Sequence, residues 1–228
     1  MKMINGWWMP DLTAENKGIP LVMGMTSFYL MGKPLYQYHK YVRAAFFCKQ
    51  KRVAVDIGAH VGCWAWVLAS EFEHVHAFEP LVENFDCLLK NLEVPFAEKI
   101  TAYPMALGDF AGSCSMRVKS SNTAVAHVLP TDGPLTSGDL RQVKQETLDR
   151  CALQGPIDFI KMDCEGFETF VIRGGEATIR QNCPVIIVEQ KPDTKDRYGL
   201  KFRSAVDLLQ SWGAYYECEI GGDHILHW

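Results

Sequence analysis

The feature that most constrains the fold of this chain is an alternation of short apolar runs with segments of helix length, which begins at Val53. The predicted strands are 53–57, 74–78, 100–107, 157–162 and 184–189. The predicted helices that follow them are 61–72, 81–92, 168–180 and 204–212. Strands that alternate with helices of this length form a parallel sheet with right-handed crossovers. We therefore predict an α/β fold with a doubly wound, mostly parallel sheet and helices on both faces.

The segments outside this alternation are predicted to be less regular. Residues 1–33 are rich in Gly, Pro, Met and aromatic residues without periodicity, which indicates an irregular arm. Apolar positions at helical spacing then predict a helix from Leu35 to Cys48. Short antiparallel strands are predicted on either side of a middle loop and in a C-terminal hairpin: 113–118, 141–146, 215–219 and 224–227.

The composition of the chain argues against two classes of partner. The 228 residues carry a formal net charge of −4, whereas a nucleic-acid binder needs a clustered excess of Lys and Arg to neutralise phosphates. No window approaches the roughly 18 uninterrupted apolar residues of a membrane span. The eight cysteines include no C-x-x-C pair, which fits a reduced, cytoplasmic compartment. We expect neither a nucleic-acid nor a membrane partner.

The turn after the first predicted strand, Asp56-Ile-Gly58-Ala-His60-Val-Gly62, is the first candidate ligand site. Open α/β sheets bind ligands at the carboxyl ends of their strands. A dinucleotide site would have G-x-G-x-x-G here, but Asp56 replaces the first glycine, and a carboxylate repels a pyrophosphate. S-adenosylmethionine carries a sulfonium and an ammonium and no phosphate, so the same carboxylate would attract it. We predict that Asp56, Gly58, Ala59, His60, Val61 and Gly62 bind this cofactor.

Within this turn, the residue types predict different contributions. Gly58 would let the backbone approach the ligand, because it has no Cβ. His60 is expected to contribute its backbone and its packing, and no acid or base chemistry.

A second carboxylate, Glu79, ends the next predicted strand. At this position it would accept hydrogen bonds from both ribose hydroxyls, and Pro80 ends the strand by removing a donor. We assign to the same pocket Asn84 on the following helix, together with Ala106 and Leu107, whose backbone groups would meet the adenine edge. The alternative for Glu79 is a cap of the next helix from an exposed turn.

Together these motifs resemble the FkbM family of methyltransferases. The resemblance covers about residues 52–191 and rests on Val-Asp-Ile-Gly-Ala-His-Val-Gly, Phe-Glu-Pro, Ala-Leu-Gly-Asp, Thr-Leu-Asp and Ile-Lys-Met-Asp-Cys-Glu-Gly-Phe-Glu. The last string is the most specific, since many unrelated methyltransferases share the glycine turn. The resemblance implies a seven-stranded class I fold, S-adenosylmethionine as the donor, and methyl transfer to a hydroxyl oxygen of a sugar or secondary metabolite.

Two acids follow the predicted strand 157–162 and are the main catalytic candidates. We expect Asp163 or Glu165 to be the general base that removes the proton of the acceptor hydroxyl. Asp163 is also assigned to the cofactor-binding residues. Glu165 alternatively caps the helix that follows. A divalent-metal site is a further alternative, but two carboxylates supply too few ligands, and a third ligand, Glu189 or Gln190, would be required. We therefore expect no metal.

Two further residues, a histidine and a lysine, differ in their predicted roles. His127 lies in a predicted loop, 120–139, that would fold over the cleft, and it is a third catalytic candidate as a contact to the acceptor. Lys161 is interpreted as a strand residue that reaches across the sheet surface and has no chemical role.

The domain organisation and the function follow from these assignments. We divide the chain into an N-terminal arm and helix, 1–50, expected to cover the acceptor pocket, and an S-adenosylmethionine-binding domain, 51–228. The predicted function is O-methylation of a small-molecule acceptor. The alternatives are a nicotinamide-dependent oxidoreductase, which the missing phosphate-binding glycines oppose, and a non-catalytic scaffold that binds S-adenosylmethionine.

Overall fold

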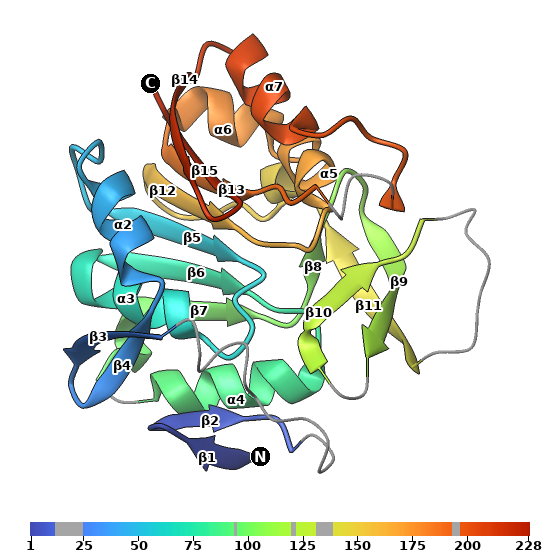
Figure 1. The fold of residues 1–228 in the computed structure, drawn as a ribbon. Helices are drawn as coiled ribbons and strands as arrows, with labels where there is room; N and C mark the ends of the chain where they lie inside the picture. Colours follow the sequence, from blue (N-terminus) through green and yellow to red (C-terminus); the bar gives the residue numbers. More distant parts are fainter. Residues whose placement is uncertain (12–24, 94, 120–121, 131–138, 193–196) are drawn as a thin grey trace.

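A seven-stranded sheet forms the centre of the molecule in the computed structural model, which describes residues 1–11, 25–93, 95–119, 122–130, 139–192 and 197–228 (Figure 1). From edge to edge the strands are β14 (Tyr215–Ile220), β15 (Asp223–His227), β13 (Val185–Glu189), β12 (Ile157–Met162), β5 (Val53–Ile57), β6 (His74–Phe78) and β7 (Ile100–Tyr103). The five strands from β13 to β7 are parallel, whereas β15 runs antiparallel to both β13 and β14. This confirms the predicted mostly parallel sheet and its C-terminal hairpin.

Helices cover both faces of this sheet because its strands are apolar on both faces. One core packs the sheet against α2 (Tyr38–Ala45), α3 (Cys63–Glu71) and α4 (Val82–Leu92). The other core packs it against α5 (Glu168–Arg173), α6 (Glu176–Asn182) and α7 (Ser204–Ser211). Parallel strands buried on both faces are expected to be continuously apolar, and β5 and β13 are buried at every position. No helix in the described part of the chain is both long and apolar enough to cross a bilayer.

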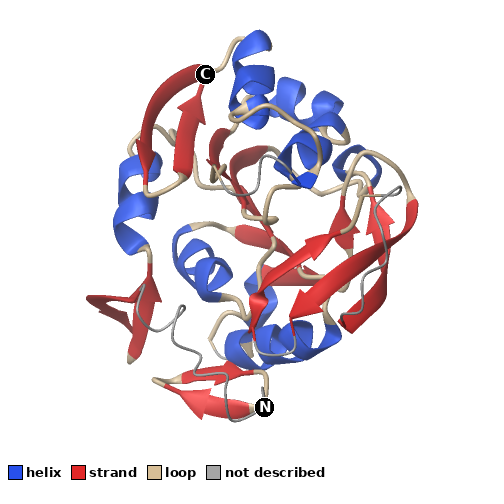
Figure 2. Cartoon of the chain, turned by 45° about the vertical axis from the view of Figure 1, so that its right-hand side comes forward, coloured by secondary structure: helices blue, strands red, loops and turns tan. Residues whose placement is uncertain are grey.

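A second sheet of four strands lies beside the carboxyl ends of the main sheet and comes forward on the right in Figure 2. Its order is β10 (Asn122–Val128), β9 (Gly112–Lys119), β11 (Asp139–Glu146) and β8 (Ala106–Leu107). The predicted strand 100–107 is therefore divided between β7 in the main sheet and β8 in this one. The prediction of a loop over 120–139 was wrong where β10 forms, because β10 pairs with β9.

The N-terminal arm is more regular than predicted. It contains two hairpins, β1 (Lys2–Ile4) with β2 (Trp7–Met9), and β3 (Met25–Leu30) with β4 (Lys33–Tyr36). Their turns, Asn5-Gly6 and Met31-Gly32, have positive φ at both residues, which is the geometry of tight hairpin turns. The first hairpin lies along α4 in Figure 1. The predicted helix 35–48 is shorter, because residues up to Tyr36 pair in β4.

The predicted helix 168–180 is two helices, α5 and α6, separated at Gly174 and Gly175. A Cβ at Gly174 would lie 1.9 Å from the carbonyl oxygen of Gly108, and one at Gly175 would lie 2.8 Å from the Leu148 side chain. Both glycines are required by this close packing, which holds α5 and α6 against the segments that follow β8 and β11.

Candidate active site

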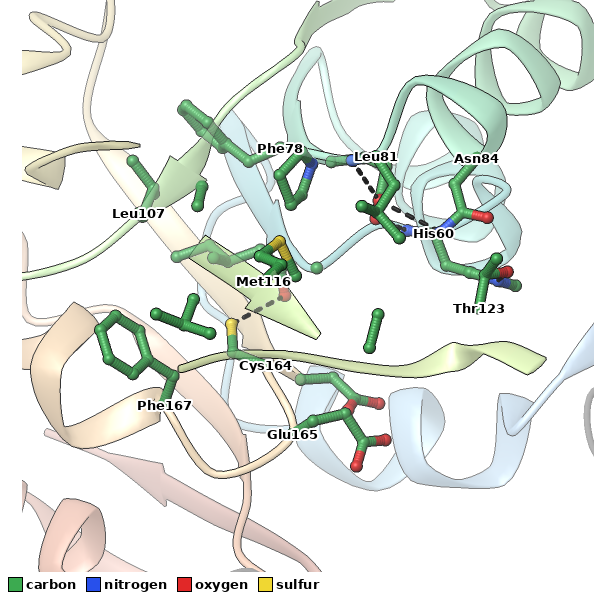
Figure 3. Close-up of a pocket in the computed structure, with 18 of the residues that line it drawn as sticks. His60, Phe78, Leu81, Asn84, Leu107, Met116, Thr123, Cys164, Glu165 and Phe167 are labelled. Atoms are coloured by element: carbon green, nitrogen blue, oxygen red, sulfur yellow. Dashed lines mark hydrogen bonds between the residues drawn. The ribbon is translucent and has the colours of Figure 1, made fainter. Parts of the chain in front are cut away.

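A pocket opens at the carboxyl ends of β5, β6 and β12, where β10 passes across it (Figure 3). Leu81 and Asn84 line one side of it, Cys164 and Phe167 the other, and Thr123 of β10 lies near its edge. This is the location predicted for a ligand of an open α/β sheet. The acids that line the pocket are Glu79, Asp163 and Glu165, and no described Lys or Arg lines it.

The glycine turn is shaped by its neighbours in the fold. The amides of Gly58 and Ala59 both donate to the carbonyl oxygen of Phe78, at 3.0 and 2.9 Å. Gly58 has a φ of +79°, and a Cβ there would lie 2.0 Å from the carbonyl oxygen of Asp163. Glycine is therefore needed here because the end of β12 comes so close, independently of the predicted approach to a ligand.

Glu79 connects the glycine turn to α4 from inside the pocket. One carboxylate oxygen accepts hydrogen bonds from the Leu81 amide at 2.9 Å and the Asn84 side-chain amide at 3.2 Å, and the other accepts from the His60 amide at 2.9 Å. Burial raises the pKa of Glu79 to about 7, although these hydrogen bonds oppose the shift. The alternative of an exposed cap is wrong, because Glu79 is only 5% exposed.

His60 connects the same turn to β10. Its Nε2 lies 3.2 Å from the Thr123 hydroxyl, and its buried Nδ1 has no hydrogen-bond partner among the described residues. Burial lowers the pKa of His60 to about 4, so the ring is neutral at physiological pH. The expectation that His60 is neither an acid nor a base stays a prediction.

The structure brings together most of the predicted site residues. Those that line the pocket are Gly58, His60, Glu79, Pro80, Asn84, Ala106, Leu107, Asp163 and Glu165. The remaining predicted residues do not line it. Ala59 and Val61 are buried in the core on the other face, and Gly62 begins α3. Their contribution to ligand binding stays a prediction.

His127 and Asp56 are separated from the pocket by the alternation of strand side chains. Ala126 and Val128 of β10 line the pocket, whereas His127 between them does not. Asp56 is 1% exposed and is paired in register with Lys161 of β12. Burial raises the pKa of Asp56 to about 7, against the opposing effect of Lys161. A role of Asp56 in ligand binding stays a prediction.

Lys161 is a strand residue of β12 that reaches across the sheet, as expected, but it is buried among carboxylates. It is 1% exposed, and its Nζ lies 3.3 Å from Asp163 Oδ2 and 3.4 Å from Asp223 Oδ1. Asp223 also pairs with Lys40 of α2, which packs over this face. Burial alone would lower the pKa of Lys161, but the surrounding carboxylates outweigh it and raise the pKa above its usual range. Lys161 is therefore a buried cation behind the catalytic candidates.

Asp163 and Glu189 lie at the ends of the adjacent strands β12 and β13. The pKa of one carboxyl group is lowered, and that of the other is raised. Burial alone would raise the pKa of Asp163, but the Lys161 ammonium outweighs it and holds that pKa below its usual range. Burial and the negative Asp163 raise the pKa of Glu189 to about 9, although Lys161 and Lys191 oppose the rise. Asp163 is thus the ionised member of the pair at neutral pH.

The acid that holds the turn after β12 is Glu168 and not Glu165. Its carboxylate accepts hydrogen bonds from the amides of Cys164 at 2.8 Å and Gly166 at 3.1 Å. Glu165 lies inside this turn with a φ of +55°, and no side chain caps α5. The predicted capping role of Glu165 is therefore wrong. The turn instead leaves the Glu165 side chain at the pocket (Figure 3).

Comparisons with known proteins define the class to which this fold belongs. A precorrin-8w decarboxylase of Methanobacterium thermoautotrophicum is 14% identical, aligns over 100% of both chains and has a TM-score of 0.51. A methyltransferase FkbM of Methylobacillus flagellatus is 19% identical with a TM-score of 0.49, over 78% of this chain and 43% of that one. A precorrin-6y C5,15-methyltransferase of Geobacter metallireducens is 13% identical with a TM-score of 0.47, over 89% and 92%. The chain has the class I methyltransferase fold.

The family follows from the sequence match. The model of the methyltransferase FkbM domain matches residues 56–216, and the chain belongs to the FkbM methyltransferase family. It spans less than half of the Methylobacillus protein. None of the curated proteins compared with the chain matches it significantly.

Proposed function

We propose that the chain transfers a methyl group from S-adenosylmethionine to a hydroxyl oxygen of a small molecule, such as a sugar or a secondary metabolite. The observation that carries this proposal is the charge of the pocket: three carboxylates and no described Lys or Arg line it. Such a lining favours a sulfonium and an ammonium and disfavours a diphosphate, because charges in a cleft interact at reduced dielectric. Membership of the FkbM methyltransferase family supports the same reaction.

The pocket residues fit the parts of the proposed cofactor. Glu79 at the end of β6 would accept hydrogen bonds from the ribose hydroxyls, and its carboxylate already accepts hydrogen bonds from Asn84 and the His60 amide. Leu81, Ala106 and Phe167 supply apolar surface for an aromatic base. When bound, S-adenosylmethionine supplies an electrophilic methyl carbon.

The residues of this chain would then orient the acceptor and remove its proton. The cofactor would supply the methyl group to the acceptor oxygen, and its sulfur would keep the electron pair of the bond that is broken. The hydroxyl proton passes to a carboxylate at the end of β12. Lys161 lowers the basicity of Asp163, which favours Glu165 as the proton acceptor. His127 is not included, because it does not line the pocket.

Calorimetry with S-adenosylmethionine and with NAD tests the proposal. Saturable binding is expected for S-adenosylmethionine alone, and Glu79→Gln should weaken it at least about tenfold, because it removes a charge-assisted acceptor. Asp86→Asn, which changes an exposed acid on α4 outside the pocket, is the control and should bind like the wild type. Saturable binding of NAD alone would reverse the assignment to the oxidoreductase alternative.

The acceptor class has its own test. Incubation with methyl-labelled S-adenosylmethionine and panels of glycans and hydroxylated metabolites should yield S-adenosylhomocysteine and a methyl ether in equal amounts. Glu165→Gln should reduce turnover by roughly 10² fold or more, as expected for the loss of a general base, while S-adenosylmethionine binding changes little. Labelled product that is methylated on carbon or nitrogen would refute O-methylation.

A further inference from the structure

We propose that a second cavity, beside the candidate active site, binds a neutral planar aromatic molecule that carries an O–H or N–H donor. The cavity has a volume of about 960 Å³, within the roughly 300 to 1,000 Å³ of small-molecule sites. Its described lining comes from the second sheet, from the start of α5 and from the chain near Tyr198. Val128 and Phe167 line both this cavity and the active-site pocket, so the two share a wall.

A cluster of aromatic side chains forms part of the lining. The rings of Phe167 and Phe170 are stacked with their centroids 4.6 Å apart, and the Tyr198 ring meets them edge-on, at 5.4 and 5.5 Å. The Tyr198 hydroxyl donates to the Val128 carbonyl oxygen at 2.6 Å, which holds the ring in place. Phe170 and Tyr198 are only partly buried. A preformed cluster of this kind favours a flat aromatic ligand, because aromatic rings attract one another in offset and edge-on arrangements.

Gln145 of β11 adds an unsatisfied hydrogen-bond acceptor to the lining of the same cavity. Its side chain is fully buried, and its Nε2 donates to the Phe110 carbonyl oxygen at 3.1 Å. This hydrogen bond sets the orientation of the amide. The buried Oε1 has no hydrogen-bond partner in the part of the chain that the structure describes. A buried acceptor without a partner is costly, and an O–H or N–H group of a ligand would satisfy it.

The charge of the lining favours a neutral ligand. Among the described residues that line the second cavity, Asp109 is the acid and Arg197 is the base, so their formal charges cancel. The active-site pocket differs, because three acids and no described Lys or Arg line it. The second cavity therefore offers no excess negative charge to attract a sulfonium and an ammonium, and the two cavities favour different ligands.

Calorimetry of the full-length chain with 2-naphthol and with 2-methoxynaphthalene tests the proposal. The two probes have the same rings, but the methoxy compound has no hydrogen-bond donor. We expect 2-naphthol to bind saturably at one site, and 2-methoxynaphthalene to bind at least about tenfold more weakly, because it leaves the Gln145 oxygen unsatisfied. Neither titration needs S-adenosylmethionine, so the result does not depend on the proposed function.

Two variants locate the site, and a third is their control. Phe170→Ala should weaken the binding of both probes at least about tenfold, because it removes a stacking partner. Gln145→Met should abolish the difference between the two probes. Neither residue lines the active-site pocket. Lys144→Gln changes an exposed side chain of β11 that lines neither cavity and should bind both probes like the wild type.

Three results would contradict the proposal. Absence of saturable 2-naphthol binding up to millimolar concentrations would overturn the site, and so would wild-type affinity in Phe170→Ala, because the probe would then bind elsewhere. Equal affinities of the wild type for both probes would overturn the role of Gln145. Thermal unfolding shows whether each variant is folded. If Gln145→Met does not fold, the two probes on the wild type decide the role of the donor, and Phe170→Ala, at a partly exposed side chain, decides the location.

Discussion

At the scale of single residues, the most demanding position of the candidate site is Gly58. Gly58 and Gly32 have nearly the same φ, +79° and +80°, but a Cβ at Gly58 would lie 2.0 Å from the Asp163 carbonyl oxygen, whereas one at Gly32 would meet nothing within 4 Å. A side chain at either glycine would therefore meet the same backbone strain at positive φ, but only one at Gly58 would also collide with another part of the chain. The contact joins the glycine turn to the acids after β12, which makes Gly58 part of the geometry of the pocket.

Replacing these two glycines separates the two costs. Gly32→Ala should lower the free energy of unfolding by about 1 kcal/mol, the usual cost of a side chain at positive φ. Gly58→Ala should lower it by about 3 kcal/mol or more, because the end of β12 has to move as well. Urea denaturation measures both. Equal losses in the two variants would mean that the turn and β12 can separate freely.

At the scale of the elements, the short turn between β12 and α5 depends on one buried acid. Glu168 is fully buried and accepts hydrogen bonds from two amides of the turn. Burial raises its pKa to about 7, against the opposing effect of these hydrogen bonds. The raised pKa means that the ionised form is less favourable in the folded chain than in the unfolded chain. The ionisation of Glu168 therefore lowers the free energy of unfolding. This loss is absent at a pH below the pKa of Glu168 in the unfolded chain and is complete at a pH above its pKa in the folded chain.

Glu168→Gln should therefore change stability in a pH-dependent way. As pH rises from about 5 to about 8, the free energy of unfolding of the wild type should fall relative to that of Glu168→Gln, by up to about 3 kcal/mol. Urea denaturation at several pH values measures this difference. Glu176→Gln, on the exposed surface of α6, controls for the removal of one charge. A constant difference between wild type and Glu168→Gln across the range would contradict the buried, raised pKa.

The elements of the main sheet could be predicted because each is an apolar run with its own turn residues. The missed elements depend on pairings that a single run does not reveal. β10 is short and its apolar residues do not alternate regularly with polar ones, and it forms by pairing with β9. The first N-terminal hairpin carried a recognisable signal, since Asn5-Gly6 is a typical two-residue hairpin turn, and that signal was overlooked.

The candidate site also contains residues that local motifs predict and residues that depend on distant pairings. Gly58, Glu79 and the acids after β12 belong to local motifs and were predicted. Lys161 was not, because its partner Asp223 is remote in the sequence and reaches it only through the antiparallel β15. The alternation of strand side chains also explains why Asp56 does not line the pocket as predicted. Its neighbour Ile57 lines the pocket, and Asp56 lies on the opposite face of the sheet.

At the scale of the whole molecule, the arm is integrated with the main core. Trp7 is fully buried, its indole nitrogen donates to the Pro34 carbonyl oxygen at 3.1 Å, and its ring packs edge-on against Trp66 of α3 at 5.9 Å. The Lys33 ammonium lies over both rings, at 4.5 and 4.4 Å. No described residue of the arm lines the pocket, and the prediction that the arm covers an acceptor falls partly on residues 12–24, outside the described ones.

Replacing Trp7 tests whether the division at residue 50 separates two folding units. If the arm and the sheet share one core, Trp7→Ala should lower the free energy of unfolding of the entire chain by about 3 to 5 kcal/mol, the usual cost of a buried aromatic truncation. Circular dichroism and tryptophan fluorescence should then report one transition at the same lowered midpoint. Met3→Ala, at a side chain that is 58% exposed in the same hairpin, should change little. An unchanged main transition in Trp7→Ala, preceded by a separate early one, would show that the arm unfolds on its own and that the sheet with its pocket does not depend on it.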